Sequence, residues 1–340
     1  MAEKLQQVED EQLQPQLSKQ QLFPPDNKCN VSKGEDILGV WDMGANAPHP
    51  IAGPGAAIVD EKMGRAYFMD INGVIYSYLY NSGEWNRLKD SPYQCSSLAI
   101  LKGLITVIGG LQKTNKKPKR KLLSITDIEG KDTWVKYFRP MPTKRHSASA
   151  VQTELNLIVA GGKNQSSCLD TVEVMAIETE IWSTLANLPK PYCMASAAIC
   201  GDCMYILGGD SESGCTKSVF ECSLSKLLHS SIAGEKQDKI WSEIKDTPMH
   251  YSTCLAMEGE VLAIGGIDDT NKTTTSIYKY NKDLDSWEMT SNMKSPLYHR
   301  LFVVLQSNGN KLIAVGGKLL LPTMKEPELT DKVEIANILL

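Results

Sequence analysis

Long hydrophobic runs and an excess of charge of one sign are both missing from this sequence of 340 residues. No apolar stretch approaches the ~20 residues that a membrane-spanning helix needs. The start of the chain is polar and lacks the basic start and apolar stretch of a signal peptide. The formal net charge of −4 implies no general attraction to nucleic acid or to an anionic membrane surface. We therefore expect a cytoplasmic protein, with the nucleus as the alternative location, that binds neither nucleic acid nor membranes.

Recognisable catalytic and metal-binding motifs are also missing. No Ser-His-Asp order, phosphate-binding glycine loop or paired carboxylate motif is present. The nine cysteines are spread from Cys29 to Cys254 without ligand spacing, which favours reduced structural thiols. Cys200 and Cys203 resemble half of a zinc or redox site, but the Gly-Asp between them is typical of a hairpin turn. We predict no catalytic residue, no metal and no cofactor.

Paired glycines recur along most of the chain. Each pair ends a short apolar run, such as LITVIGG or EVLAIGG, that has the length and composition of a β-strand. The five pairs are Gly109-Gly110, Gly161-Gly162, Gly208-Gly209, Gly265-Gly266 and Gly316-Gly317. The pairs follow one another at nearly even intervals of about 50 residues, a period that indicates a repeat architecture.

Six tryptophans keep nearly the same period. They are Trp41, Trp85, Trp134, Trp182, Trp241 and Trp287. A third strand-like run, such as TSIYKY, lies between a glycine pair and the next tryptophan, and the tryptophan opens a fourth. Four short strands repeated about every 50 residues predict the blades of a β-propeller. In that fold the indole rings would fill the wedge between neighbouring blades.

This pattern resembles the kelch repeat family, in which a strand ending in Gly-Gly is followed by a Tyr-containing strand and then by Trp. The fifth repeat matches best, with Gly265, Gly266, Tyr278, Tyr280 and Trp287. The resemblance covers residues 36–340 and implies an all-β, six-bladed kelch-type propeller. The first repeat departs from the pattern, with Met69-Asp70 in place of the diglycine. A WD-repeat propeller is disfavoured because Trp-Asp occurs once, at Trp41-Asp42.

The two ends of the sequence complement each other. The last diglycine is followed by one more strand, VEIANIL, but by no tryptophan, whereas the strand around Trp41 has no blade before it. An open ring would leave an unpaired strand edge. We therefore predict that the N-terminal strand completes the last blade. The predicted parts are a flexible or short helical segment, residues 1–35, and a monomeric propeller, residues 36–340.

The resemblance also implies a binding face. In the kelch family it is formed by the loops that enter each blade and by the loops between the second and third strands. Here the first set supplies Tyr93, Arg145, Tyr192, Tyr251, His299 and Arg300, and the second supplies Asn164, Asp210 and Asp268. Kelch adaptors of cullin ubiquitin ligases are similar and hold acidic peptides with Arg, Ser and Tyr, which Arg145 and Arg300 would match. The alternative is a polar rim that shares no ligand.

The sequence therefore predicts a protein-interaction scaffold that is not an enzyme. One such role would be substrate recognition for a ubiquitin ligase, although residues 1–35 are too few for the helical region of those adaptors. The alternative is a small-molecule enzyme, either metal-dependent or sugar- or thioglucoside-processing, with its site at the channel rim. His146, His250 and His299 are expected at equivalent blade positions and would serve it. The basic run 116–121 is either an import signal or anionic patch, or a solvated loop.

Overall fold

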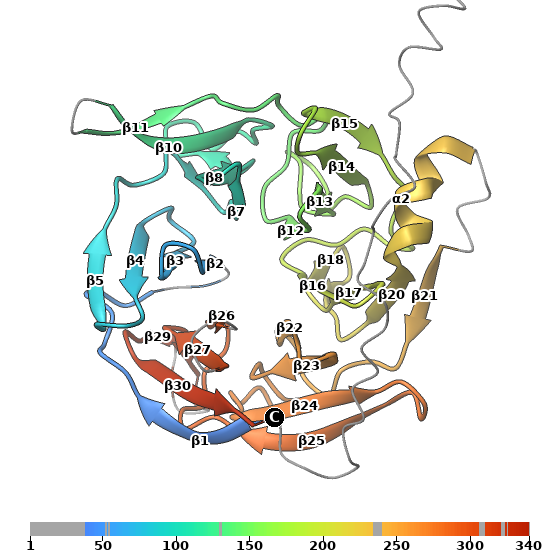
Figure 1. The fold of residues 1–340 in the computed structure, drawn as a ribbon. Helices are drawn as coiled ribbons and strands as arrows, with labels where there is room; N and C mark the ends of the chain where they lie inside the picture. The colour runs from blue at the N-terminus through green and yellow to red at the C-terminus, as the bar shows by residue number, and fades with distance from the viewer. Residues whose placement is uncertain are drawn as a thin grey trace, which may run out of the picture. The chain divides into compact units, whose positions relative to one another are not determined.

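Six four-stranded antiparallel sheets are arranged around a central axis in the computed structural model (Figure 1). The structure describes residues 38–51, 53, 55–128, 131–233, 240–305, 310–320, 324 and 326–339. The predicted segment 1–35 lies outside these residues. Each sheet is one blade, and in blades one to five the strands pair in chain order from the innermost strand outward. The predicted six-bladed, all-β propeller is confirmed.

The strand bounds repeat from blade to blade. Blades one to three contain β2 (Ala56–Asp60), β3 (Arg65–Met69), β4 (Ile75–Leu79) and β5 (Glu84–Arg87); β7 (Ser97–Leu101), β8 (Leu104–Ile108), β10 (Leu122–Ile128) and β11 (Lys131–Val135); and β12 (Ser149–Gln152), β13 (Asn156–Ala160), β14 (Val172–Ala176) and β15 (Ile181–Thr184). Blades four and five contain β16 (Ser196–Cys200), β17 (Cys203–Leu207), β20 (Val219–Ser223) and β21 (Trp241–Ile244); and β22 (Thr253–Met257), β23 (Glu260–Ile264), β24 (Ser276–Asn281) and β25 (Ser286–Asn292). Blade six contains β26 (Leu301–Leu305), β27 (Lys311–Val315), β30 (Val333–Ile338) and β1 (Leu38–Met43).

Three small two-stranded sheets lie in the loops between these strands. They are β6 (Tyr93–Gln94) with β9 (Leu111–Gln112), β18 (Asp210–Ser211) with β19 (Gly214–Cys215), and β28 (Lys318–Leu319) with β29 (Glu328–Leu329). Each joins segments on the face where the second-to-third-strand loops lie. In the part of the chain that the structure describes, every helix falls short of the length and apolar character that crossing a membrane requires.

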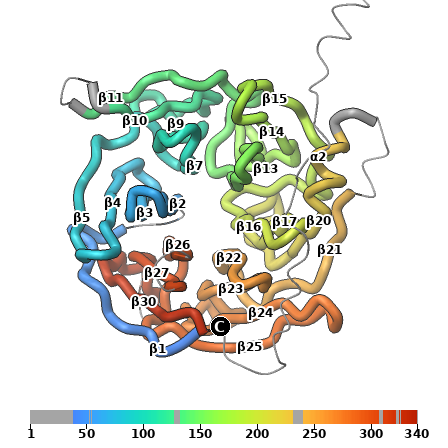
Figure 2. Tube along the Cα trace, viewed as in Figure 1, coloured from blue at the N-terminus to red at the C-terminus, as the bar shows by residue number. Residues whose placement is uncertain are grey.

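The N-terminal strand closes the ring. β1 is the outermost strand of blade six and pairs antiparallel with β30, so that Trp41 lies opposite Ala336. Figure 2 shows this closure as the blue start of the described chain lying beside its red end. The pairing satisfies the backbone donors and acceptors that β30 would otherwise leave at an open edge. The predicted closure is therefore confirmed.

Five of the six tryptophans make the same hydrogen bond. Each indole N–H donates to a backbone carbonyl just beyond the outer strand of the preceding blade. These bonds run from Trp85 to Ala45 (3.0 Å), Trp134 to Asp90 (2.8 Å), Trp182 to Arg139 (3.1 Å), Trp241 to Ala186 (3.3 Å) and Trp287 to Lys245 (2.9 Å). The tryptophan of one blade thus holds the chain that leaves its neighbour. Among the described residues, the indole N–H of Trp41, at the seam of the ring, has no partner.

The glycine pairs are required by backbone conformation. All ten glycines have positive φ, where L side chains are strained. At Gly209 (φ 93°) a Cβ atom would also lie 2.5 Å from the carbonyl oxygen of Cys193, in the loop that enters blade four. Blade one has no glycine pair because its loop between the second and third strands, β3 and β4, is shorter than in the other blades. There the Asp70 carboxylate accepts a 2.7 Å hydrogen bond from the N–H of Val74 and closes the turn.

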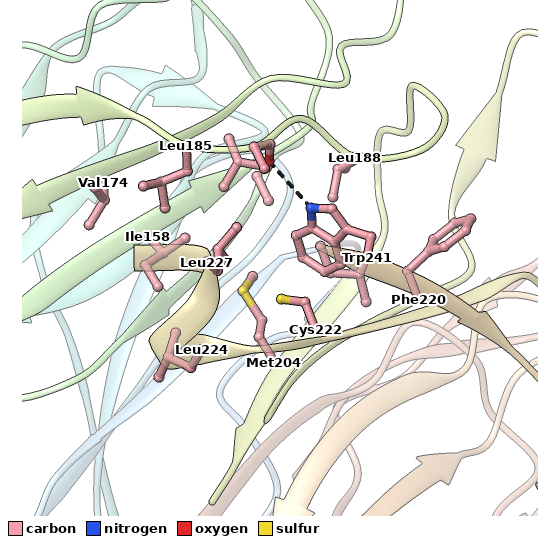
Figure 3. Packing of buried hydrophobic residues seen from close by; sticks show 14 of the residues in the cluster. Ile158, Val174, Leu185, Leu188, Met204, Phe220, Cys222, Leu224, Leu227 and Trp241 are labelled. Atoms are coloured by element: carbon pink, nitrogen blue, oxygen red, sulfur yellow. Dashed lines mark hydrogen bonds between the residues drawn. The ribbon is translucent and has the colours of Figure 1, made fainter. Parts of the chain in front are cut away.

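The core is divided among the interfaces between blades. Six clusters of buried apolar side chains each join two neighbouring blades, so each sheet buries both of its faces only within the ring. The cluster between blades three and four also takes in α2 (Leu224–Ala233), which lies in the long connection before Trp241. Figure 3 shows Leu224 and Leu227 of this helix in the same cluster as Ile158 and Met204. Ser223 caps the helix, since its Oγ accepts the N–H of Lys226 at 3.3 Å.

Candidate binding face at the channel mouth

The two predicted loop sets meet on one face of the ring. The loops that enter the blades lie against the second-to-third-strand loops and form backbone bridges with them. These bridges join His146 to Lys163, Cys193 to Asp210, His250 to Ile267 and Tyr298 to Lys318. The predicted residues therefore share a face, but their side chains have very different surroundings.

Five residues at the mouth of the channel share an uncommon backbone conformation. They occupy equivalent positions just before the innermost strands of blades two to six. They are Cys95 (φ 51°), Ser147 (φ 52°), Met194 (φ 56°), Tyr251 (φ 54°) and His299 (φ 53°), and we call them the mouth residues. A non-glycine residue in this left-handed region costs free energy. Backbone hydrogen bonds connect some of them around the mouth, from Ser147 to Cys95 (2.7 Å) and from Met194 to Ser147 (2.9 Å).

The sequence interpretation found two of the mouth residues and missed Cys95, Ser147 and Met194. The signal was present as a constant spacing. Four of the five mouth residues, Tyr251 included, precede the next glycine pair by the same interval along the chain. The interval after His299 is slightly longer, because the hairpin of blade six is longer.

Tyr251, Asp210 and His299 come together at the mouth. The Tyr251 hydroxyl donates a 2.7 Å hydrogen bond to Oδ1 of Asp210, and its ring centroid lies 4.9 Å from that of His299. Burial, together with the acceptor Asp210, raises the pKa of Tyr251. Burial and the nearby Lys318 charge lower the pKa of His299 to about 3. At neutral pH this corner of the mouth thus presents a neutral phenol and a neutral imidazole beside the side chain of Asp210.

Arg145 and Arg300 are not part of the exposed surface, which corrects the role predicted for them. Their side chains are each 1% exposed. Arg145 forms a 3.1 Å ion pair with Glu173 of β14, and Arg300 forms a 2.9 Å ion pair with Glu334 of β30. Each guanidinium also donates a hydrogen bond to a backbone carbonyl near the end of the second strand of the same blade. Arg145 donates to Gly161 (2.7 Å) and Arg300 donates to Ala314 (3.1 Å). Both arginines therefore hold the loop that enters a blade against that blade's own sheet.

Four other predicted residues are also engaged within the fold. Tyr93 and Tyr192 are buried, and the Tyr192 ring packs against Phe220 with centroids 5.6 Å apart. The side chain of Asn164 accepts the backbone N–H groups of residues 166 and 167 and so shapes its own loop. Asp268 does the same with residues 270 and 272. Burial of the tyrosine side chains contradicts their predicted contact with a partner.

The mouth residues Met194, Tyr251 and His299 also line the channel. A cavity of about 270 Å³ is lined by the innermost strands of all six blades, mostly with small side chains. Its hydroxyl groups join adjacent blades. Ser97 donates to the carbonyl of Ala148 (2.7 Å), Ser149 donates to that of Ala195 (2.6 Å), and Ser196 accepts the N–H of Cys254 (2.9 Å). These side chains hold the ring together.

Known proteins share this repeat pattern. Residues 94–317 match the sequence profile described as the KLHDC2/KLHL20/DRC7 Kelch-repeats domain. The match covers more than half of the chain and runs from the loop before blade two into blade six. The chain belongs to the kelch-repeat family.

Individual relatives are distant. The Kelch repeat and BTB domain-containing protein 1 of Cowpox virus is 22% identical over 251 residues, 72% of this chain and 41% of that protein. Kelch-like protein 25 of Xenopus tropicalis is 24% identical over 213 residues, 60% of this chain and 34% of that protein. The chain spans less than half the length of these curated relatives. A solved structure titled "Structure of YjhT" superposes with a TM-score of 0.67 at 14% identity, over 85% of this chain and 95% of that one, and shows a shared fold.

His146, His250 and His299 do not all occupy equivalent positions in this kelch propeller, so the expectation from the sequence was wrong for one of them. His146 and His250 occupy the bridged position, whereas His299 lies one position later, among the mouth residues. His146 contacts Ser147 (Nδ1 to Oγ, 3.0 Å), and His250 approaches Asp269 (Nε2 to Oδ1, 3.5 Å). Among the described residues, no three His, Cys, Asp or Glu side chains gather as metal ligands would.

The predicted hairpin between Cys200 and Cys203 is present. The two cysteines face each other as the last pair of β16 and β17. Both are free thiols, like the other cysteines of the described part of the chain. Burial raises the pKa of Cys200 to about 11, so its unreactive thiol form predominates at neutral pH. This pair is part of the blade-four hairpin.

Proposed function

We propose that this kelch propeller is a protein-interaction module that binds a segment of a partner protein at the channel mouth. The observation that carries the proposal is the ring of mouth residues. Glycine or asparagine would adopt their left-handed backbone at lower cost, yet the chain has Cys, Ser, Met, Tyr and His there. Five such residues gather around one opening, and backbone strain commonly clusters at functional sites. A varied set of half-buried side chains around one opening suits recognition of a side chain or chain end.

We further propose that the module binds without carrying out a reaction. The hydroxyl groups that line the channel support this view because they are engaged in hydrogen bonds between blades. The histidines support it as well. His146 and His250 have polar neighbours of their own, and His299 occupies a different position of the repeat, so the three are not equivalent. Stoichiometric copper, iron or zinc in the purified protein would contradict this proposal and favour a metal-dependent enzyme.

The partner would be a substrate brought to a ubiquitin ligase, as the resemblance to cullin adaptors implies. One relative, the Cowpox virus protein, carries in its name a BTB domain beside its kelch repeats. Cullin among the proteins captured with this chain would support that role. Consistent absence of cullin while other partners are captured would contradict the ubiquitin-ligase role and leave the binding-module proposal standing.

The test of the binding face is the double variant Met194→Asn/Tyr251→Asn. Asparagine tolerates the left-handed backbone, so both side chains are removed with little strain. We expect quantitative mass spectrometry of captured proteins to show at least about a tenfold loss of the specific partner, the scale of losing hot-spot contacts.

The matched control is Lys102→Asn/Glu258→Asn. These residues have similar φ angles (49° and 51°) in the hairpin turns at the opposite end of the inner strands. The net charge of the protein is unchanged in both double variants. Partner capture should survive in the control. Equal capture by both variants, with unchanged unfolding curves, would show that the partner does not bind at the mouth.

A further inference from the structure

A basic groove lies on the same face of the propeller as the mouth residues. It has a volume of about 560 Å³ and is bounded by the loop before β10, the segment after β11 and the β13–β14 loop. Six of its lining residues are cationic: Lys117, Lys119, Arg120, Lys121, Lys136 and Lys144. A backbone bridge from Lys119 to Arg145 ties the groove to the loop that enters blade three. Much of the basic run thus lines a concave site.

The positive charge of the groove is not neutralised within the described part of the chain. No lining residue is acidic, and none of the six cations forms an ion pair with a described carboxylate. Elsewhere on the surface, cations such as Lys190 and Lys217 do have such partners, Glu243 at 3.1 Å and Asp269 at 2.7 Å. Contact with the Lys136 amine and its charge lower the pKa of Lys121. An anionic ligand would relieve this repulsion.

The lining of the groove also has an apolar part. Pro140 is exposed there, whereas Phe138 and Pro118 also line the groove but are buried, and Phe138 packs into the core between blades two and three. The β13–β14 loop contributes the exposed side chains of Gln165 and Ser166, which can hydrogen-bond to a peptide backbone. Cations beside apolar and polar lining groups suit a short peptide that alternates carboxylates with apolar side chains.

Other polyanions fit this site less well. Single-stranded nucleic acid needs exposed aromatic faces for stacking, and the one aromatic lining residue, Phe138, is buried. A long polyanion or an anionic membrane would also be repelled by the net negative charge of the protein, which is −4. A short segment senses chiefly the local potential, because salt screens charges beyond about 8 Å.

We propose that this groove binds an acidic segment of the partner protein that the mouth recognises. The site deepens the proposed function and rests on it, because the groove and the mouth share one face and one partner could reach both. Linking two contacts in one chain raises affinity without requiring either contact to be strong.

The experiment measures fluorescence anisotropy of labelled peptides with the whole protein. One peptide alternates Glu and Leu, and its control has Gln in place of every Glu. We expect the acidic peptide alone to bind, and its affinity to fall as salt is raised from about 50 to about 300 mM. Lys121→Glu/Lys136→Glu should weaken binding at least about tenfold, because it reverses two charges at the rim. Lys62→Glu/Lys226→Glu changes the net charge equally, away from the groove, and should leave binding within about twofold.

Several results would overturn the proposal. Equal binding of the two peptides, or equal effects of the two double variants, would show that the groove does not select carboxylates. Tighter binding of a single-stranded oligonucleotide or of phosphatidylserine vesicles would assign it to another class of ligand. If Lys121→Glu/Lys136→Glu still captures the cellular partner while Met194→Asn/Tyr251→Asn does not, the groove proposal fails and the proposed function stands.

Discussion

Replacement of Arg145 by methionine distinguishes a structural arginine from a ligand-binding one. In the structure this change removes the 3.1 Å ion pair with Glu173 and the 2.7 and 2.9 Å hydrogen bonds to the carbonyls of Gly161 and Thr171. It leaves a carboxylate that is 2% exposed, with Thr143 as its remaining partner. A buried charge without its counterion is among the most costly defects in a folded protein.

We expect Arg145→Met to lower the free energy of unfolding by about 3–5 kcal/mol, the cost of breaking a buried pair from one side. Glu173→Leu in addition removes the stranded charge. The double variant should therefore regain about 1–3 kcal/mol relative to the sum of the single changes, the usual range for residues in direct contact. A surface arginine would behave differently, since its loss changes stability by about 0.5 kcal/mol or less.

The assay is urea unfolding followed by tryptophan fluorescence. Arg139→Met is the control, because that side chain is exposed and follows the outer strand of the neighbouring blade. If Arg145→Met unfolds at the same urea concentration as Arg139→Met, the buried ion pair does not hold the loop and the argument is wrong. If it unfolds as expected, substitutions of Arg145 or Arg300 cannot be used to test partner binding, because they destabilise the propeller itself.

Two further predictions concern stability. The pKa of His299 falls from its ordinary 6.5 to about 3 in the fold, so between these pH values the unfolded chain binds more protons and stability decreases as pH falls. Because the side chain is only half-buried, urea unfolding should show a slope below the full ~1.4 kcal/mol per pH unit, and His299→Gln should lack it. Gly209→Ala should be less stable than Gly201→Ala by about 1–3 kcal/mol. Both glycines have positive φ, but a Cβ meets backbone atoms only at Gly209, so equal unfolding midpoints would contradict the predicted clash.

The basic run shows how much of a binding site can be predicted from local sequence. Residues 116–121 are visibly cationic in the sequence, but a solvated loop and an anion site look alike there. The groove exists because Lys136 and Lys144, which follow β11 further along the chain, approach the same run in space. Packing of two blades decides whether positive charge is dispersed or concentrated.

The number of blades and the closure of the ring followed from the sequence alone. Each blade is a local strand–turn–strand pattern marked by a glycine pair and a tryptophan, and it contacts chiefly its neighbours, so spacing along the chain determines spacing around the ring. The burial of Arg145 and Arg300 could not be predicted in this way. An arginine in a loop looks the same in sequence whether it is solvated or buried. Only the folded blade brings in Glu173 and Glu334 from its third strand, and their charges decide that both arginines point inward.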